Sequence, residues 1–316
     1  VLPSSYSPKS DRTYPVQYWI PAMGVSSRGV LQYFQSRGVY DPIRDENGRG
    51  QEFVKVLVGS LGRRGHLGWV DSENNGSASM SFVDEIIPAI EAEFPAIAKP
   101  EARFLVGHSL GGWSALSLLV DHPQKFAGAW ALAPDPVDFQ DFYGVDLYAS
   151  RANLYVDQRG LERYLARVGG RGAVTFRTQA AFEEIVGTGN LLQSWEAMLS
   201  PRGVDGEPRP MFDRVTGAID GNVVQQWSRH DIHRKLAANW NRDGRYLAGK
   251  IHIKVGDADN YWLHRPLVGL AESLDAWKAD AQVEFLPGLD HLALDAVPIH
   301  RQVQREIEAM WENRAR

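Results

Sequence analysis

Residues 126–133 form a run in which every side chain is apolar or glycine. A strand with this composition is buried on both faces, which is typical of a parallel sheet covered by helices on each side. Shorter β-rich runs and helical patterns alternate before it, at residues 16–20, 30–37, 53–58, 80–94, 103–106 and 110–120. The alternation resumes afterwards, at residues 251–255, 263–277, 282–286 and 299–311. The pattern predicts an α/β fold with a mostly parallel central sheet flanked by helices.

The alternation stops between residues 134 and 249, where mixed polar segments surround a loop-like stretch at residues 200–210. We interpret residues 134–249 as a large lid-like insertion. Residues 1–133 and 250–316 are then the N-terminal and C-terminal parts of one sheet-containing core. Trp195, Trp227 and Trp240 lie in the insertion, and we expect them either to roof a substrate pocket or to form a small core of the insertion itself.

Composition excludes several classes of function. The formal net charge is −5 and Lys and Arg form no run, so a nucleic-acid partner or an anionic membrane surface is not expected. No apolar stretch is long enough to span a bilayer. The absence of cysteine excludes a disulfide framework, a zinc–thiolate site, an iron–sulfur cluster and a thiol nucleophile.

The chain begins Val1-Leu2-Pro3, with neither methionine nor a basic and apolar leader, and is expected to have been processed or trimmed. The sequence does not determine the cellular compartment of the protein. A soluble protein, either cytoplasmic or exported, fits the sequence.

The segment Gly107-His108-Ser109-Leu110-Gly111 follows a predicted strand and precedes a predicted helix. This G-x-S-x-G arrangement is the sequence form of a nucleophile elbow, in which a strained turn exposes the serine hydroxyl above the strand end. Gly107 and Gly111 are expected because a side chain at either position would collide with neighbouring backbone. The backbone N–H of Leu110, at the start of the helix, is then one donor to an oxyanion forming over Ser109.

A serine hydroxyl needs a base to take its proton and an acid to orient that base, and on this fold both follow the serine in the chain. Residues 251–255 lead into Asp257 and Asp259, either of which can be the acid. Residues 282–286 lead into His291, which we expect to be the base. Both strands should deliver these side chains to the carboxyl edge of the sheet.

No metal or cofactor is expected. His230 and His233 have no third ligand at a recognisable spacing. The glycine-rich residues 59–65 match neither common phosphate-binding motif and fit a loop at the rim of the site.

Taken together, these segments resemble the putative-esterase family of α/β hydrolases, which includes S-formylglutathione hydrolases, feruloyl esterases and enterochelin esterases. The resemblance rests on residues 14–20, 82–88 and 107–112 and on the two C-terminal strand ends. It implies the α/β-hydrolase fold, Asp259 rather than Asp257 as the acid, and Met23 as the second oxyanion donor. Relatives usually carry His-Gly where this chain has Pro21-Ala22, and a misaligned loop there would weaken activity.

The resulting hypothesis is a serine carboxylic-ester hydrolase with the triad Ser109, His291 and Asp259 and a covalent acyl-enzyme. Its substrate would be a small-molecule or carbohydrate-linked ester. Two alternatives remain: an acyltransferase that uses the same acyl-enzyme, and a non-catalytic binding protein on the same scaffold, for which Ala22 is the only hint.

Overall fold

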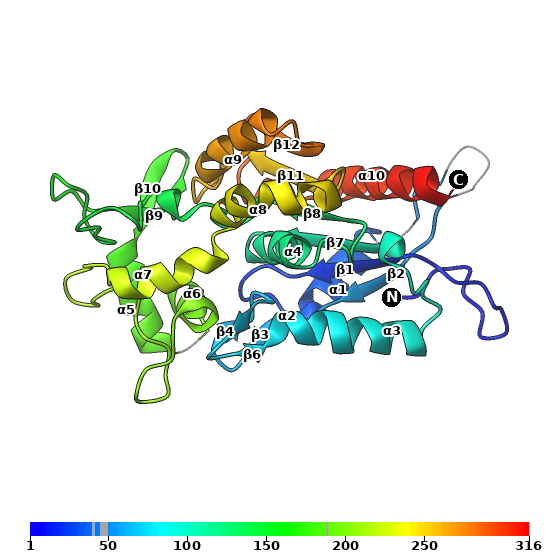
Figure 1. The fold of residues 1–316 in the computed structure, drawn as a ribbon, viewed down its shortest axis with the longest axis horizontal. Coiled ribbons are helices and arrows are strands. Elements are labelled where there is room, and N and C mark those ends of the chain that lie inside the picture. Colours follow the sequence, from blue (N-terminus) through cyan, green and yellow to red (C-terminus); the bar gives the residue numbers. More distant parts are fainter. Residues whose placement is uncertain (40–41, 45–49, 188, 316) are drawn as a thin grey trace.

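The computed structural model describes residues 1–39, 42–44, 50–187 and 189–315. In this part of the chain a six-stranded sheet has the order β12-β11-β8-β7-β1-β2, and every neighbouring pair is parallel. Its strands are β1 (Val16–Ile20), β2 (Val54–Leu57), β7 (Arg103–His108), β8 (Gly128–Leu132), β11 (Ile251–Gly256) and β12 (Ala281–Leu286). The predicted parallel sheet is confirmed, and its two halves come from the two ends of the sequence (Figure 1).

Helices cover both faces of the sheet because side chains along each strand alternate between two apolar cores. In β7, Leu105 joins the larger core, whereas Phe104 and Val106 join the smaller one. The larger core includes residues of α3 (Ile87–Glu93), α4 (Leu110–Asp121), α8 (Ile232–Leu247) and α9 (His264–Ala276). The smaller core includes residues of α1 (Ser27–Gln35) and α10 (Val297–Ala315).

The predicted helix over residues 80–94 is divided into three parts by its proline. It consists of α2 (Ala78–Ser81), a π-helical segment (Phe82–Ile86) and α3. Pro88 lacks an N–H, and its ring crowds the carbonyl four residues earlier in an ordinary α-helix. The backbone just before Pro88 widens instead, and the N–H of Ile87 bonds to the carbonyl of Phe82 five residues back. The helix therefore accommodates Pro88 through a π-helical segment.

The elements of residues 134–249 gather mainly at one end of the molecule, away from both termini (Figure 1). They include the antiparallel pair β9 (Tyr164–Val168) and β10 (Arg171–Thr175), and the helices α5 (Phe176–Val186), α6 (Leu191–Leu199) and α7 (Gly221–Trp227). The last helix of this region, α8, packs against α4 in the core.

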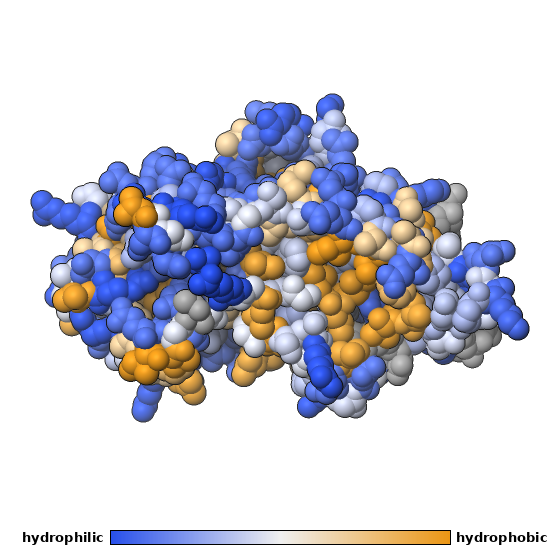
Figure 2. All heavy atoms as spheres, turned by 90° about the horizontal axis from the view of Figure 1, so that it is seen from below, coloured by the Kyte–Doolittle hydropathy of each residue, from blue (hydrophilic) through white to orange (hydrophobic). Residues whose placement is uncertain are grey.

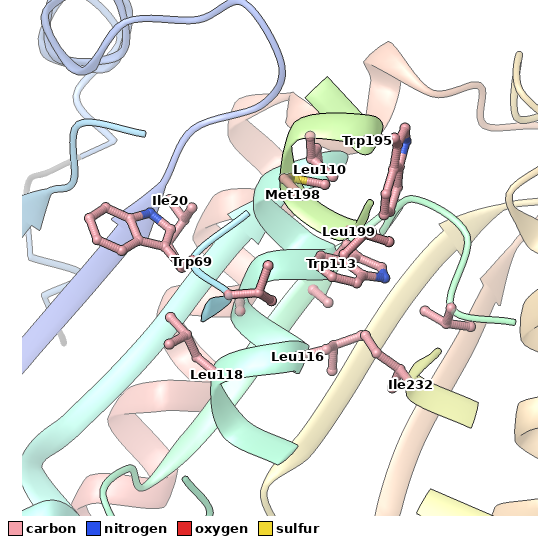
Figure 3. Close-up of a cluster of buried hydrophobic side chains, with 14 of the residues drawn as sticks. Ile20, Trp69, Leu110, Trp113, Leu116, Leu118, Trp195, Met198, Leu199 and Ile232 are labelled. Carbon is pink, nitrogen blue, oxygen red and sulfur yellow. The ribbon is translucent and has the colours of Figure 1, made fainter. Parts of the chain in front are cut away.

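Two of the three tryptophans noted in this region are fully buried in the larger core, so they do not roof a pocket. Trp195 of α6 meets Trp113 of α4 edge to face, with ring centroids 5.0 Å apart (Figure 3). Trp227 packs beside Trp195 and Phe142. Trp240 stacks on Trp277 of the core instead. The region thus shares one continuous core with the sheet.

The remaining elements are short. They are the strands β3 (Leu61–Gly62), β4 (Gly65–His66), β5 (Asp71–Ser72) and β6 (Gly76–Ser77), and the 3₁₀ turns Pro100–Ala102, Phe139–Asp141, Ser228–His230 and Leu292–Asp295. Viewed from below, charged and polar residues cover much of the surface, and apolar side chains gather near its middle (Figure 2). Within the described residues, no helix has both the length and the apolar character needed to cross a membrane.

Candidate active site

Ser109 lies in a strained turn between β7 and α4. Its backbone has φ 56° and ψ −128°, a conformation that costs a non-glycine residue on the order of 1–3 kcal/mol. Three backbone hydrogen bonds hold the turn: the N–H of Ser109 donates to Leu132, and its carbonyl accepts from Trp113 and Asp135. The surrounding structure therefore fixes the position of the hydroxyl at the carboxyl edge of the sheet.

The two glycines of the turn stand where backbone segments touch. A Cβ at Gly107 would lie 2.2 Å from the carbonyl oxygen of Gly111, and one at Gly111 would lie 2.1 Å from that of Ile20. Neither contact can be relieved by rotating a side chain, because both partners are backbone atoms. The close approach of α4 to β7 thus depends on Gly107, and its close approach to β1 depends on Gly111.

His291 and Asp259 are brought together by the loops that follow β12 and β11. His291 Nδ1 lies 2.8 Å from Asp259 Oδ2, and both side chains are buried. The loops can meet because Gly256 has no side chain: a Cβ there would lie 1.9 Å from the carbonyl oxygen of Leu289. Asn260 also links the two loops, because its side-chain oxygen accepts a hydrogen bond from the backbone N–H of His291.

The other candidate acid, Asp257, serves a different purpose. Its Oδ1 accepts a hydrogen bond from the N–H of Gly288 at 2.7 Å, which stabilises the turn after β12. Of the two aspartates left open by the strand pattern, the structure therefore pairs Asp259 with His291.

Asp259 is held as a carboxylate by its hydrogen-bond donors. Burial would raise its pKa, but the hydrogen bond with His291 and the backbone N–H groups of Leu263 and Tyr261 outweigh burial and lower it. The anion can consequently orient the imidazole and stabilise its protonated form.

The hydroxyl of Ser109 points to a different acidic residue. Its Oγ donates to Asp135 Oδ1 at 3.1 Å, and no hydrogen bond joins it to His291 within the described chain. Asp135 follows β8 and is 3% exposed. Tyr143 donates to its other oxygen at 2.9 Å, and Trp195 donates to the Tyr143 hydroxyl. Burial raises the pKa of Asp135 to about 6.

Ser109, Asp135 and His291 face one cavity of about 360 Å³. Rotation of the Ser109 side chain about a single bond is all that is needed to redirect its hydroxyl within this space. The other residues that line the cavity are Ala22, Met23, Val25, His108, Tyr143, Leu165, Gln179, Asn190, Leu191, Tyr261, Leu292 and Asp295. Residues 134–249 thus contribute walls to the cavity through Asp135, Tyr143, β9 and the segment around α5 and α6.

The predicted oxyanion donors lie on two sides of Ser109. Leu110 begins α4, so its N–H has no intrahelical acceptor. Met23 lies in a turn in which the N–H of Val25 donates to Ala22 and Gly24 adopts φ 70°. A positive φ at the third position is typical of a type II turn. Both Ala22 and Met23 line the cavity.

A second, apolar cavity of about 350 Å³ adjoins the first. The two share Ala22, Val25, His108 and Asp295, and the second continues beneath α1 toward Trp19 and the aromatic residues of that helix. Burial lowers the pKa of His108 to about 4, so its imidazole is neutral at pH 7. Its Nε2 lies 2.9 Å from the carbonyl oxygen of His291 and helps to position that residue.

Asp135, Tyr143 and His108 were not expected to belong to the site. Asp135 could have been found by the argument that located Asp259, since it also follows an apolar strand at the carboxyl edge of the sheet. Tyr143 lies in irregular chain, where no periodic pattern marks it. His230 and His233, considered above as metal ligands, lie elsewhere: His233 pairs with Asp138 and Ser273.

Comparison with known proteins adds an independent line of evidence. A family model described as "Putative esterase" matches residues 1–261. No curated protein matches the chain.

Several solved structures share its fold. The fluorophosphonate-binding serine hydrolase FphF of Staphylococcus aureus aligns with a TM-score of 0.52 at 15% identity, over 98% of this chain and 90% of that one. A ferulic acid esterase aligns with a TM-score of 0.55 at 13% identity, with the same coverage. The S-formylglutathione hydrolase of S. aureus aligns with a TM-score of 0.55 at 14% identity, again over 98% and 90%. The expected α/β-hydrolase architecture is confirmed.

Proposed function

The chain belongs to the putative esterase family, and on this premise we propose that it is a serine carboxylic-ester hydrolase with Ser109, His291 and Asp259 as its catalytic triad. The observation that carries the proposal is the 2.8 Å contact between His291 Nδ1 and Asp259 Oδ2 at the rim of the cavity that contains Ser109. With Nδ1 bonded to the carboxylate, Nε2 of His291 is the nitrogen available to the serine.

The first half of the reaction transfers the acyl group to the enzyme. The Ser109 hydroxyl turns from Asp135 toward His291, and its oxygen attacks the ester carbonyl while Nε2 accepts its proton. The N–H groups of Leu110 and Met23 stabilise the resulting oxyanion. The carbonyl re-forms, the bond to the alcohol oxygen breaks, and the imidazolium returns its proton to that oxygen as the alcohol leaves.

The second half releases the acid. A water molecule attacks the acyl carbon while His291 takes one of its protons, and collapse of the second oxyanion breaks the bond to Ser109 Oγ, which recovers the proton. Asp259 stays ionised throughout and stabilises the imidazolium in both halves. The adjoining apolar cavity offers room for a hydrophobic part of the ester.

Hydrolysis of p-nitrophenyl acetate by Ser109→Ala tests this assignment. We expect a loss of at least about a thousandfold in kcat/KM, because the nucleophile is removed. Ser117→Ala is a matched control, since Ser117 lies buried in α4 and its hydroxyl has no hydrogen-bond partner. Undiminished turnover in a folded Ser109→Ala variant would contradict the assignment.

A further inference from the structure

Asp135 is a buried carboxylate for which no ion pair with Lys or Arg is found among the described residues. The groups that face it are the hydroxyls of Ser109 and Tyr143, the imidazole of His291 and, at greater range, the carboxylate of Asp259. Among the described residues that line the cavity there is no Lys or Arg. The other lining carboxylate, Asp295, is paired with His300. A buried anion without a cation destabilises the folded state. The presence of Asp135 therefore calls for a functional explanation.

The position of Asp135 is rigidly fixed. Ala133, two residues earlier, adopts φ 39°, and the N–H of Asp135 donates to the carbonyl of Ser109. The hydrogen-bonded chain from Trp195 through Tyr143 occupies Oδ2. Oδ1 therefore stays directed at the nucleophile, and within the part of the chain that the structure describes the Ser109 hydroxyl is its one hydrogen-bond donor.

Acylation removes this one donor. Once the Ser109 hydroxyl has turned to His291 and Oγ has become an ester oxygen, which carries no hydrogen, Asp135 Oδ1 lacks the donor that lies 3.1 Å away in the free protein. A buried acceptor that loses its hydrogen-bond donor raises the free energy of the acyl-enzyme. A donor on the substrate, placed next to the acyl carbon, would remove this free-energy cost.

The cavity around Asp135 suits a positively charged donor. Tyr143 and Tyr261 both line it, with ring centroids 6.4 Å apart in an edge-to-face arrangement. Aromatic faces attract cations, and a carboxylate forms its strongest hydrogen bonds with charged donors. A nitrogen attached to the carbon next to the acyl carbon lies roughly 3–4 Å from Oγ, and Asp135 Oδ1 lies 3.1 Å from Oγ in the free protein, so the two spacings are compatible with a hydrogen bond between them.

We propose that the cavity selects esters that carry a protonated amine beside the scissile carbonyl, as in an α-amino acyl ester, and that Asp135 binds this ammonium group in the part of the cavity lined by Tyr143 and Tyr261. The proposal rests on the esterase function above and specifies its substrate class. Asp135 thus determines specificity, whereas Asp259 orients the base.

The test compares two ethyl esters of the same size, L-alanine ethyl ester and ethyl isobutyrate, in which a methyl group replaces the ammonium. At pH 7 most of the amino ester is protonated and most of Asp135 is ionised. We expect wild-type kcat/KM to favour the amino ester by at least about tenfold, because the ammonium group both binds Asp135 and withdraws electrons from the carbonyl. The electron withdrawal is the same in every variant, so Asp135→Asn should lower the ratio by about ten- to a hundredfold, as for the loss of a hydrogen bond to a charged group. Because the ratio compares two substrates of the same variant, any effect of the substitution on the reactivity of Ser109 cancels.

Asp290→Asn is the control, because Asp290 is exposed and does not line the cavity; it should keep the wild-type ratio. A wild-type ratio of unity or below, or an unchanged ratio in Asp135→Asn, would overturn the ammonium site while leaving the esterase assignment intact. If the wild type hydrolyses neither these esters nor p-nitrophenyl acetate, both proposals are overturned.

A second measurement needs no variant. L-Alaninamide and isobutyramide form a matched pair of amides with and without the ammonium group, and each can protect wild-type Ser109 from a fluorophosphonate. We expect alaninamide to protect at a concentration at least tenfold lower. Equal protection by the two amides would refute the ammonium site.

Discussion

Replacing Asp135 by asparagine should stabilise the fold near neutral pH, although Asp135 contacts the nucleophile. Asparagine can keep both contacts, because its carbonyl accepts from Tyr143 and its amide donates to Ser109. The substitution removes only the charge. Burial raises the pKa of Asp135 from 3.8 to about 6, a difference of roughly 2 units, and each unit corresponds to about 1.4 kcal/mol. The charge therefore costs the folded state about 3 kcal/mol.

The sign of the pH dependence follows from this shift. Because the folded protein binds the Asp135 proton more tightly than the unfolded chain, stability decreases as pH rises between about 4 and 6. The advantage of Asp135→Asn is thus absent below about pH 4 and complete above about pH 7. For a chain of 316 residues, 3 kcal/mol corresponds to about 4–5 °C in Tm.

Urea unfolding of both proteins between pH 4.5 and 8, followed by far-UV circular dichroism, measures this difference. The free-energy gap between the variant and the wild type should widen with pH across the interval from 4.5 to 7. A gap that does not change with pH, or a variant that is less stable than the wild type at pH 8, would refute the argument.

Three further substitutions test the site and its support. Asp259→Asn should lower kcat for p-nitrophenyl acetate by about four orders of magnitude in a folded protein, because the imidazole of His291 loses the anion that orients it. A decrease in kcat of less than about tenfold would contradict the role of Asp259. Gly111→Ala should prevent folding or lower the free energy of unfolding by several kcal/mol, because the added Cβ would meet backbone atoms. Gly59→Ala is the control: no atom of the described residues lies within 4 Å of the added Cβ, so thermal unfolding should be nearly unchanged. Trp195→Ala should lower the free energy of unfolding, measured by urea titration, by about 3–5 kcal/mol, because Trp195 is buried in the larger core. A decrease of less than about 1 kcal/mol would show that residues 134–249 do not share that core.

Periodic segments of the core were predictable from sequence because their burial is dictated by the sheet. Residues 16–20 were predicted as a strand and form β1 with the same bounds, and the fully apolar residues 126–133 contain β8 at the centre of the sheet. The division of residues 80–94 into three helical segments was not predictable in detail, because propensity shows that Pro88 disturbs a helix but not how the backbone adapts.

Strand order could anticipate that His291 meets an aspartate from the loop after β11, since both follow parallel strands that end at the same edge, but the choice of Asp259 over Asp257 was implied only by the family resemblance. The rotamer of Ser109 could not be anticipated, because the strand pattern can place Asp135 at the same edge of the sheet but does not show which acceptor the hydroxyl takes. The role of Trp195 in α6 could not be predicted either, since an aromatic residue in a segment without the strand–helix alternation fits a pocket wall as well as a core.

The assignment of Ser109 as the nucleophile is tested most directly by the site of covalent modification. After reaction with a fluorophosphonate, peptide mass spectrometry should locate one adduct on Ser109, and esterase activity should fall in proportion to its occupancy. His291→Ala should react much more slowly, because the hydroxyl has lost its base. An adduct on another residue, or a fully modified Ser109 in an enzyme that still hydrolyses p-nitrophenyl acetate, would contradict the account.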